Sequence, residues 1–301
     1  MDDLLQAPKR NDLIYDVGLH RGEDTEFYLR KGFRVVAFEA NPALVDSCRS
    51  RFAHFIERGQ LVIIEGAIVD SGTLAAGCGR VRFYENEAGT GWGTVHQTWA
   101  ERNQRQGAPS NVMEVQTIDF ARVVADHGVP HYLKIDIEGA DLVCVSALKA
   151  FKERPDYISI ESDKTSFANI GAEIDLFCEL GYDSFQAVEQ SRIPECQRPP
   201  SPAREGSYVP HRFELGASGL FGAELEPSWK SRAEVLRLYR LIRLGYYLLG
   251  DEGRMYKWQF RGASTLRRLA NGLLGRLTGA PVPGWYDTHA RLSKTMRPAG
   301  F

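Results

Sequence analysis

Short apolar runs alternate with segments of helical periodicity over the first 190 residues of this 301-residue chain. The runs that predict strands lie at residues 13–15, 34–38, 61–67, 132–137, 157–161 and 182–188. The segments that predict helices lie at residues 23–31, 42–58, 118–128, 140–151 and 174–181. Strands that take turns with helices in this way are typical of a mostly parallel sheet covered by helices, so the pattern predicts an α/β fold.

A second, smaller pair of strands is expected beside this series. Residues 81–85 predict one strand, and the alternating pattern of residues 112–118 predicts an antiparallel partner for it. Between them, the segment 89–94 reads GTGWGT and predicts a glycine-rich loop. Trp92 in this loop offers a face for stacking on a sugar ring, with simple packing of the hairpin as the alternative.

The alternation stops after residue 190. Residues 190–210 contain five prolines and few apolar residues, which predicts a loop. Residues 232–249 and 264–277 predict two basic amphipathic helices, and residues 285–292 return to a strand-like composition.

The segment 13–42 carries the clearest indication of chemistry. It reads LIYDVGLHRGEDTEFYLRKGFRVVAFEANP, in the order strand, glycine turn, helix, strand, acid. Gly18 and Gly22 let the backbone pass close to a ligand, and the helix N-terminus offers unpaired N–H groups. Glu39 at the end of the second strand is placed to accept hydrogen bonds from two ribose hydroxyls. This order indicates half of a nucleotide-binding unit, with an ordinary turn and a chance acid as the alternative.

The turn itself is D-x-G-x-x-x-G and not the G-x-G-x-x-G of dinucleotide sites. Glu23 and Asp24 would repel a pyrophosphate at the helix start, whereas a nucleoside with an amino-acid tail, such as S-adenosylmethionine, suits this turn. A nicotinamide-dependent sugar dehydrogenase or epimerase is the alternative enzyme. It requires that dinucleotide turn and a Tyr-x-x-x-Lys pair, and the sequence has neither. A cofactor-binding scaffold without transfer activity is the alternative outside the enzymes.

Three blocks of this sequence resemble the signature blocks of the FkbM-type S-adenosylmethionine-dependent methyltransferases. They are DVGLHRGEDT at residues 16–25, VVAFEANP at residues 35–42 and YLKIDIEGAD at residues 132–141. The resemblance extends over about residues 13–190. It implies a class I (Rossmann-like) methyltransferase fold, with a seven-stranded, mostly parallel sheet and an antiparallel last strand. It also implies, most often, methyl transfer to a hydroxyl oxygen.

The resemblance also implies how the remainder of the chain is arranged. A class I sheet needs a seventh strand inserted antiparallel between the fifth and the sixth, and we assign residues 285–292 to it. Residues 1–189 are then the methyltransferase core with the cofactor site. Residues 190–283 are a basic helical insertion that forms a cap, and residues 284–301 are the last core strand and a tail.

The expected cofactor site gathers around the strand ends. Asp16 is expected at the methionine amino group, Glu39 at the ribose, Asn41 at the adenosine and the segment 65–68 at the adenine. Asp16 and Thr25 could instead cap the turn and the helix, and Asn-Pro is also a common turn start. The predicted cofactor-binding residues are Asp16, Gly18, His20, Gly22, Thr25, Glu39, Ala40, Asn41, Ala67 and Asp136.

Three residues are predicted to be catalytic: Asp136, Glu161 and His20. The resemblance places Asp136 at the active site, where it could be the base, a metal ligand or a cofactor contact. Glu161 and Asp163 close the next strand, and with Asp136 they could hold Mg²⁺, although no metal site is predicted. His20 lies in the cofactor turn, where it could be a base or a solvated turn residue.

Charge and composition restrict the classes of partner that the chain could bind. The net charge is only −2, but residues 229–276 hold eleven Lys and Arg against three Asp and Glu. Such a segment suits an anionic acceptor, a membrane surface or a homodimer contact. No nucleic-acid motif is present, and no apolar run is long enough to span a membrane. The acidic N-terminus and five scattered cysteines favour a cytoplasmic protein. The expected acceptor is an anionic small molecule or glycan: a sugar, a glycan precursor or a secondary metabolite.

Overall fold

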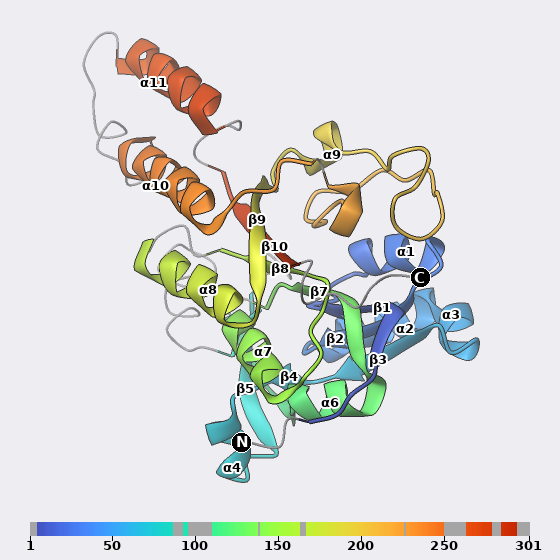
Figure 1. The fold of residues 1–301 in the computed structure, drawn as a ribbon. Coiled ribbons are helices and arrows are strands. Elements are labelled where there is room, and N and C mark those ends of the chain that lie inside the picture. Colours follow the sequence, from blue (N-terminus) through green and yellow to red (C-terminus); the bar gives the residue numbers. More distant parts are fainter. Residues whose placement is uncertain are drawn as a thin grey trace.

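The computed structural model describes residues 5–86, 93–95, 110–137, 139–162, 167–225, 227–249, 263–278 and 284–293. Figure 1 shows a central sheet with helices on both sides and a helix pair, α10 and α11, that stands out from one end of the molecule.

The central sheet has seven strands. They are β1 (Lys9–Val17), β2 (Arg34–Glu39), β3 (Leu61–Glu65), β7 (Val129–Ile135), β8 (Tyr157–Glu161), β9 (Tyr182–Glu189) and β10 (Tyr286–Leu292). Their order is β3-β2-β1-β7-β8-β10-β9, and β10 runs antiparallel to both β8 and β9. The prediction that the last strand inserts between the fifth and the sixth is therefore confirmed, and with it the class I fold.

A smaller sheet lies beside the first. It contains β4 (Ala67–Ile68), β5 (Arg80–Asn86) and β6 (Ser110–Ile118), in the order β4-β6-β5. The antiparallel pairing of β5 with β6 confirms the predicted second pair. The single strand predicted over residues 61–67 is wrong, because the chain turns at Gly66, whose φ is 140°, and β4 leaves the central sheet to pair with β6.

The helices differ from the prediction mainly at their ends. They are α1 (Glu23–Arg30), α2 (Pro42–Arg51), α3 (Ala53–Glu57), α4 (Ser71–Ala75), α6 (Phe120–His127), α7 (Asp141–Ala147), α8 (Phe167–Glu179), α9 (Ile193–Cys196), α10 (Arg232–Leu249) and α11 (Ala263–Thr278). Short 3₁₀ turns follow at Leu148–Ala150 and Gly222–Glu224. The helix predicted over residues 42–58 is two helices, because Phe52 leaves the helical conformation between them.

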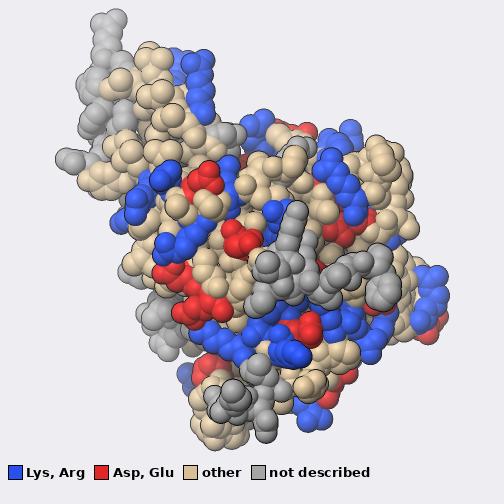
Figure 2. Space-filling view, viewed as in Figure 1, with Lys and Arg blue, Asp and Glu red and all other residues tan. Residues whose placement is uncertain are grey.

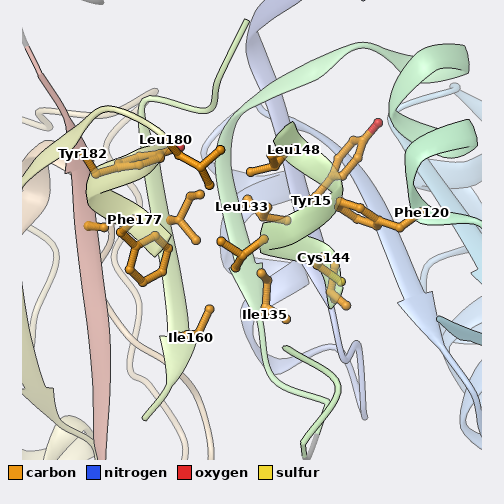
Figure 3. Packing of buried hydrophobic residues seen from close by; sticks show 14 of the residues in the cluster. Tyr15, Phe120, Leu133, Ile135, Cys144, Leu148, Ile160, Phe177, Leu180 and Tyr182 are labelled. Atoms are coloured by element: carbon orange, nitrogen blue, oxygen red, sulfur yellow. The ribbon is translucent and has the colours of Figure 1, made fainter. Parts of the chain in front are cut away.

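Each face of the central sheet carries its own core. Tyr15 points into the cluster under α6, α7 and α8, whereas its neighbour Ile14 points into the cluster under α1. Figure 3 shows part of the first cluster, where Tyr15 and Phe120 lie together and Phe177 packs farther along the sheet.

The first part of the predicted insertion belongs to the second cluster. Phe213, Phe221 and Leu225 are buried there against α1. The rings of Tyr132 on β7 and Phe221 stack with their centroids 4.9 Å apart. The division of the chain at residue 190 thus stays a prediction, and residues 193–225 pack as a layer on the core.

Buried charges fasten this layer. Lys31 at the end of α1 pairs with Glu224 at 2.6 Å, and both side chains are fully buried. His131 on β7 lies between Asp156, at 2.8 Å, and Glu205, at 3.0 Å. These links join residues 205–224 to the end of α1 and to the sheet.

The helix α10 is anchored to the carboxyl end of the sheet. The Tyr239 hydroxyl lies 2.5 Å from the Thr288 hydroxyl and 3.2 Å from the Ser162 hydroxyl, and Ser162 donates to Glu173 at 2.9 Å. All four side chains are buried. This network holds α10 beside β10.

Candidate active site

A cavity of about 380 Å³ opens at the carboxyl ends of the central strands. It lies where the strand order reverses between β1 and β7, which is the position at which open α/β sheets bind ligands. Its wall is built by the β1–α1 turn, the ends of β2, β7 and β8, the start of β10, and residues 216–218 of the layer.

A row of carboxylates crosses the sheet at this end. The strand registers align Val17 with Phe38 and Ile135, Ile135 with Ile160, and Glu161 with Asp287. At the next position toward the carboxyl ends of the parallel strands, five residues lie side by side across the sheet: Glu39, Gly18, Asp136, Glu161 and Asp287. The four acids all line the cavity.

Gly18 interrupts the row for a steric reason. Its φ is 95°, and a Cβ at this position would lie 2.0 Å from the backbone oxygen of Asp136. The turn after β1 therefore passes directly against the end of β7, and only glycine allows that approach. The gap separates Glu39 from the three acids on the other side.

The Glu39 carboxylate is fixed by the backbone. It accepts hydrogen bonds from the N–H groups of His20 and Asn41, both at 2.8 Å. Burial raises the pKa of Glu39, and these two bonds oppose the rise. A carboxylate offers about four acceptor positions, so two remain for the hydroxyls of a ribose.

The predicted adenosine residues divide into two groups. Ala40 and Ala67 line the cavity. Asn41 is buried outside its wall, where its side chain accepts from the Ala43 N–H at 3.0 Å and donates to Glu85 at 2.6 Å. Asn41 therefore caps the start of α2 and holds β5 beside the site. A direct contact of Asn41 with the cofactor stays a prediction.

A buried lysine balances part of the negative charge. Lys134 Nζ donates to the Gly18 carbonyl at 2.9 Å and lies 3.1 Å from Asp16, 3.6 Å from Asp24 and 3.9 Å from Asp136. Burial opposes its charge, but the three carboxylates outweigh burial and hold the pKa of Lys134 well above its usual value. Our sequence analysis did not select Lys134, although a lysine inside an apolar strand is rarely buried unless it is paired.

Asp16 and Thr25 lie behind the cavity wall. Asp16 is fully buried and accepts from the Thr25 hydroxyl at 2.6 Å. Neither residue lines the cavity, and nor does Gly22, which packs against the Phe52 ring. Asp16 therefore acts on the cavity through Lys134, and direct contacts of these three residues with a cofactor stay predictions.

Asp24 does line the cavity and joins the layer to it. Both of its carboxylate oxygens lie 3.0 Å from the Ser218 N–H, which donates to them. Burial raises the pKa of Asp24 to about 6, and Lys134 opposes the rise. Gly216, Ala217 and Ser218 form the adjacent wall. Sequence analysis placed Asp24 at the helix start but gave no sign of this partner, which lies 194 residues away.

His20 and Glu23 form a pair at the cavity edge. The His20 Nδ1 lies 3.0 Å from the Glu23 carboxylate, and both residues line the cavity. Burial raises the pKa of Glu23, but the hydrogen bond with His20, a backbone hydrogen bond and the charges of His20 and Lys134 together outweigh burial, so the net shift is downward. The predicted role of His20 as a base stays a prediction, with Glu23 as its partner.

Asp287 on β10 was missed by sequence analysis. It faces the cavity beside Glu161, and burial, Asp136 and Glu161 raise its pKa well above the usual value. The nearby His289 on the same strand is buried outside the cavity wall, and burial lowers its pKa to about 3. The alternation of the strand could have indicated Asp287, since residues 285 and 287 point to one face and line the cavity together.

The metal alternative involves residues that are not described. Asp163, named with Asp136 and Glu161 as a Mg²⁺ ligand, lies outside the described residues, as do Trp92 and Glu138. Among the residues that the structure describes, no group of three His, Cys, Asp or Glu side chains is placed to hold a metal ion.

The described cavity wall is rich in carboxyl groups. Six carboxylates line it: Glu23, Asp24, Glu39, Asp136, Glu161 and Asp287. Within the described part of the wall, Lys134 is the one Lys or Arg, and its ammonium is already held by Asp16 and Asp24. A ligand with positive charge, such as a sulfonium bearing an ammonium group, complements this wall.

Comparison with protein families finds a match over more than half of the chain. The family model described as the methyltransferase FkbM domain matches residues 16–184. No protein with a curated description matches the chain in sequence.

Solved structures resemble the chain only distantly. A methyltransferase from Thiobacillus denitrificans in complex with S-adenosyl-L-homocysteine has 10% identity and a TM-score of 0.33, over 95% of this chain and 87% of that one. A methyltransferase from Geobacter sulfurreducens in the same kind of complex has 10% identity and a TM-score of 0.32, over 95% and 84%. The precorrin-6y C5,15-methyltransferase from Geobacter metallireducens has 12% identity and a TM-score of 0.33, over 60% and 68%. Likenesses this low do not bear on activity.

Proposed function

Because the chain belongs to the FkbM methyltransferase family and is thus an S-adenosylmethionine-dependent methyltransferase, we propose that it methylates a hydroxyl oxygen of an uncharged, polyhydroxylated acceptor. A sugar or a glycan precursor is the class of acceptor that fits. The observation that carries the proposal is the row of carboxylates divided by Gly18, with Glu39 on one side and Asp136, Glu161 and Asp287 on the other.

The Glu39 side suits the cofactor. Glu39 would accept from the ribose hydroxyls, and Ala40, Ala67 and Ile68 would lie against the adenine. Asp24 would meet the methionine ammonium group, with its carboxylate held in place by Lys134 and by the Ser218 N–H. When bound, the cofactor supplies an electrophilic methyl group on a sulfonium.

The other side suits the acceptor. An alcohol has a high pKa, so its proton must leave to a base as the oxygen attacks the methyl carbon. The Asp136 side chain is 41% exposed and lines the cavity, so it is the carboxylate that an acceptor hydroxyl could reach. Asp136 would take the proton of the hydroxyl as its oxygen attacks the methyl group that the bound cofactor would supply, with the sulfide product of the cofactor as the leaving group.

The charged side chains of the same cavity wall bear on the charge of the acceptor. The basic insertion favours an anionic acceptor, as the sequence analysis expected. The described part of the cavity favours an uncharged one, because a phosphate beside Asp136 and Glu161 would meet like charge and no available cation. Carboxylates are good acceptors for sugar hydroxyls.

A transfer assay with labelled S-adenosylmethionine tests this function. The panel should pair each neutral sugar or glycan with its phosphorylated form, and each reaction should run with and without a chelator. We expect turnover on a neutral member and weaker turnover on its phosphorylated partner. Calorimetry that finds cofactor binding but no turnover on any member would favour the non-catalytic scaffold. Preference for the phosphorylated partner would refute the uncharged acceptor alone.

A further inference from the structure

The helix α11 exposes a stripe of leucines. Leu266, Leu269, Leu273 and Leu277 are 42%, 66%, 62% and 56% exposed. Their spacing of three, four and four residues places them within an arc of about 80° on one side of the helix. The stripe is about 17 Å long at 1.5 Å per residue. Isolated exposed leucines are common on proteins, whereas four in one stripe need a partner.

The other side of α11 is already occupied. Leu274 is 7% exposed, and α11 packs against α10, so the leucine stripe is the side that the helix pair leaves uncovered. In Figures 1 and 2 this pair stands out from the body of the protein, with blue Lys and Arg atoms beside its tan surface.

The charge of α10 and α11 indicates which kind of partner could cover the leucine stripe. The sequence of α11 contains three arginines and no acid, and α10 contains four arginines and one acid. Arg276 lies at the border of the leucine stripe, seven residues from Leu269, and is exposed. A second copy of the chain would bring two acid-free basic helices together, which like charges oppose. An anionic lipid surface offers opposite charge for the arginines and an apolar layer for the leucines.

We propose that α11 docks on an anionic membrane surface, with the leucine stripe at the boundary between headgroups and acyl chains and the arginines among the headgroups. No helix among the described residues is long and apolar enough to cross a bilayer. Trp285 of the cavity wall follows Thr278 by seven residues, so it lies within about 25 Å of the end of α11 whatever path the chain takes. Docking would therefore hold the cavity near the membrane.

Vesicle sedimentation with the full chain tests this surface without reference to its activity. Vesicles of phosphatidylcholine alone are compared with vesicles in which one third of the lipid is phosphatidylglycerol. We expect binding to the anionic vesicles that weakens as salt is raised. L269Q/L273Q should reduce the partition coefficient at least about tenfold, since two leucines lose their apolar burial. R268Q/R276Q should reduce it about 25-fold on anionic vesicles, about fivefold for each arginine.

The matched control is V112Q/L215Q. These two residues are 58% and 69% exposed and lie on other parts of the surface, so their replacement should leave vesicle binding unchanged. Thermal unfolding of each variant shows that the fold is retained. Light scattering measures the state of association in parallel.

Three results would overturn the proposal. The first is that the unaltered protein binds neither kind of vesicle, and the second is that it binds both equally, which would remove the anionic preference. A dimer that L269Q/L273Q converts to a monomer, without vesicle binding by the unaltered protein, would assign the stripe to self-association.

Discussion

Replacing Lys134 by methionine should destabilise the protein by about 3–5 kcal/mol at neutral pH, which is the usual cost of removing one partner from a buried ion pair. Its Nζ lies 3.1 Å from Asp16 and 3.6 Å from Asp24, and the three side chains are at most 5% exposed. Methionine fills nearly the same space with an apolar chain, so the loss would come from unpaired carboxylates and not from a cavity.

The loss should shrink as the pH falls. Burial already raises the pKa of Asp24 to about 6. An unfolded aspartate titrates near pH 3.9, so the folded protein takes up a proton as the pH falls from about 6 to about 4. A group whose folded pKa is raised in this way makes the folded state more stable as the pH falls through that window. Without Lys134 the pKa of Asp24 would rise further, so the variant should recover at pH 5 part of what it loses at pH 8.

Urea unfolding at pH 5 and pH 8, followed by tryptophan fluorescence, measures both effects. Lys149→Met is the matched control, because Lys149 forms a 2.8 Å pair with Glu179 but is 54% exposed. Removing an exposed pair costs at most about 1 kcal/mol. A loss for Lys134→Met no larger than that of the control, or larger at pH 5 than at pH 8, would refute the assignment of Lys134 as the charge that balances the site.

Four other outcomes are expected. Glu39→Ala should weaken S-adenosylmethionine binding by about 1–3 kcal/mol in calorimetry, and unchanged affinity would remove its ribose role. Asp136→Asn should lower kcat by about 10²-fold with little change in Tm, and a near-normal rate would exclude it as the base. Asp287→Asn should change acceptor KM or kcat and leave cofactor affinity intact, as measured by steady-state kinetics. His131 has a pKa raised to about 9, because hydrogen bonds with Asp156 and Glu205 outweigh burial. It should stabilise the fold by about 3 kcal/mol below pH 6.5 and lose this as the pH rises through 9, and His131→Gln should lack that slope in urea unfolding.

The fold was predictable because its signals are local. Each core strand is a short apolar run next to a helical segment, and the family resemblance then supplied the position of the last strand. The errors fall where a single residue changes the path of the chain. Gly66 sends β4 to the smaller sheet, and Phe52 divides one helix into two. Neither residue differs in type from others that lie inside regular elements, so the pattern alone could not identify them.

Only those residues of the candidate site that lie at strand ends within the three sequence blocks were predictable. Gly18, Glu39 and Asp136 follow directly from strand ends within recognisable blocks. Asp287 joins them through the register of β10 with β8, over a sequence separation that no local pattern spans. Lys134 was visible in the same block as Asp136, but its role depends on Asp16 and Asp24, which meet it only in the folded sheet.

The two parts of the predicted insertion have different physical roles. Residues 193–225 contribute buried aromatic side chains to the core under α1, and the Ser218 N–H donates to Asp24 in the cavity wall. Removing them would leave Lys31 unpaired in the core and Asp24 without its donor, so cofactor binding and folding should fail together. The helix α11 has the opposite character, because its leucine stripe is exposed and its loss would leave the cavity wall intact. The first part of the insertion therefore completes the wall of the candidate cavity, whereas the second part lies outside that wall and, in our proposal, contacts a membrane surface.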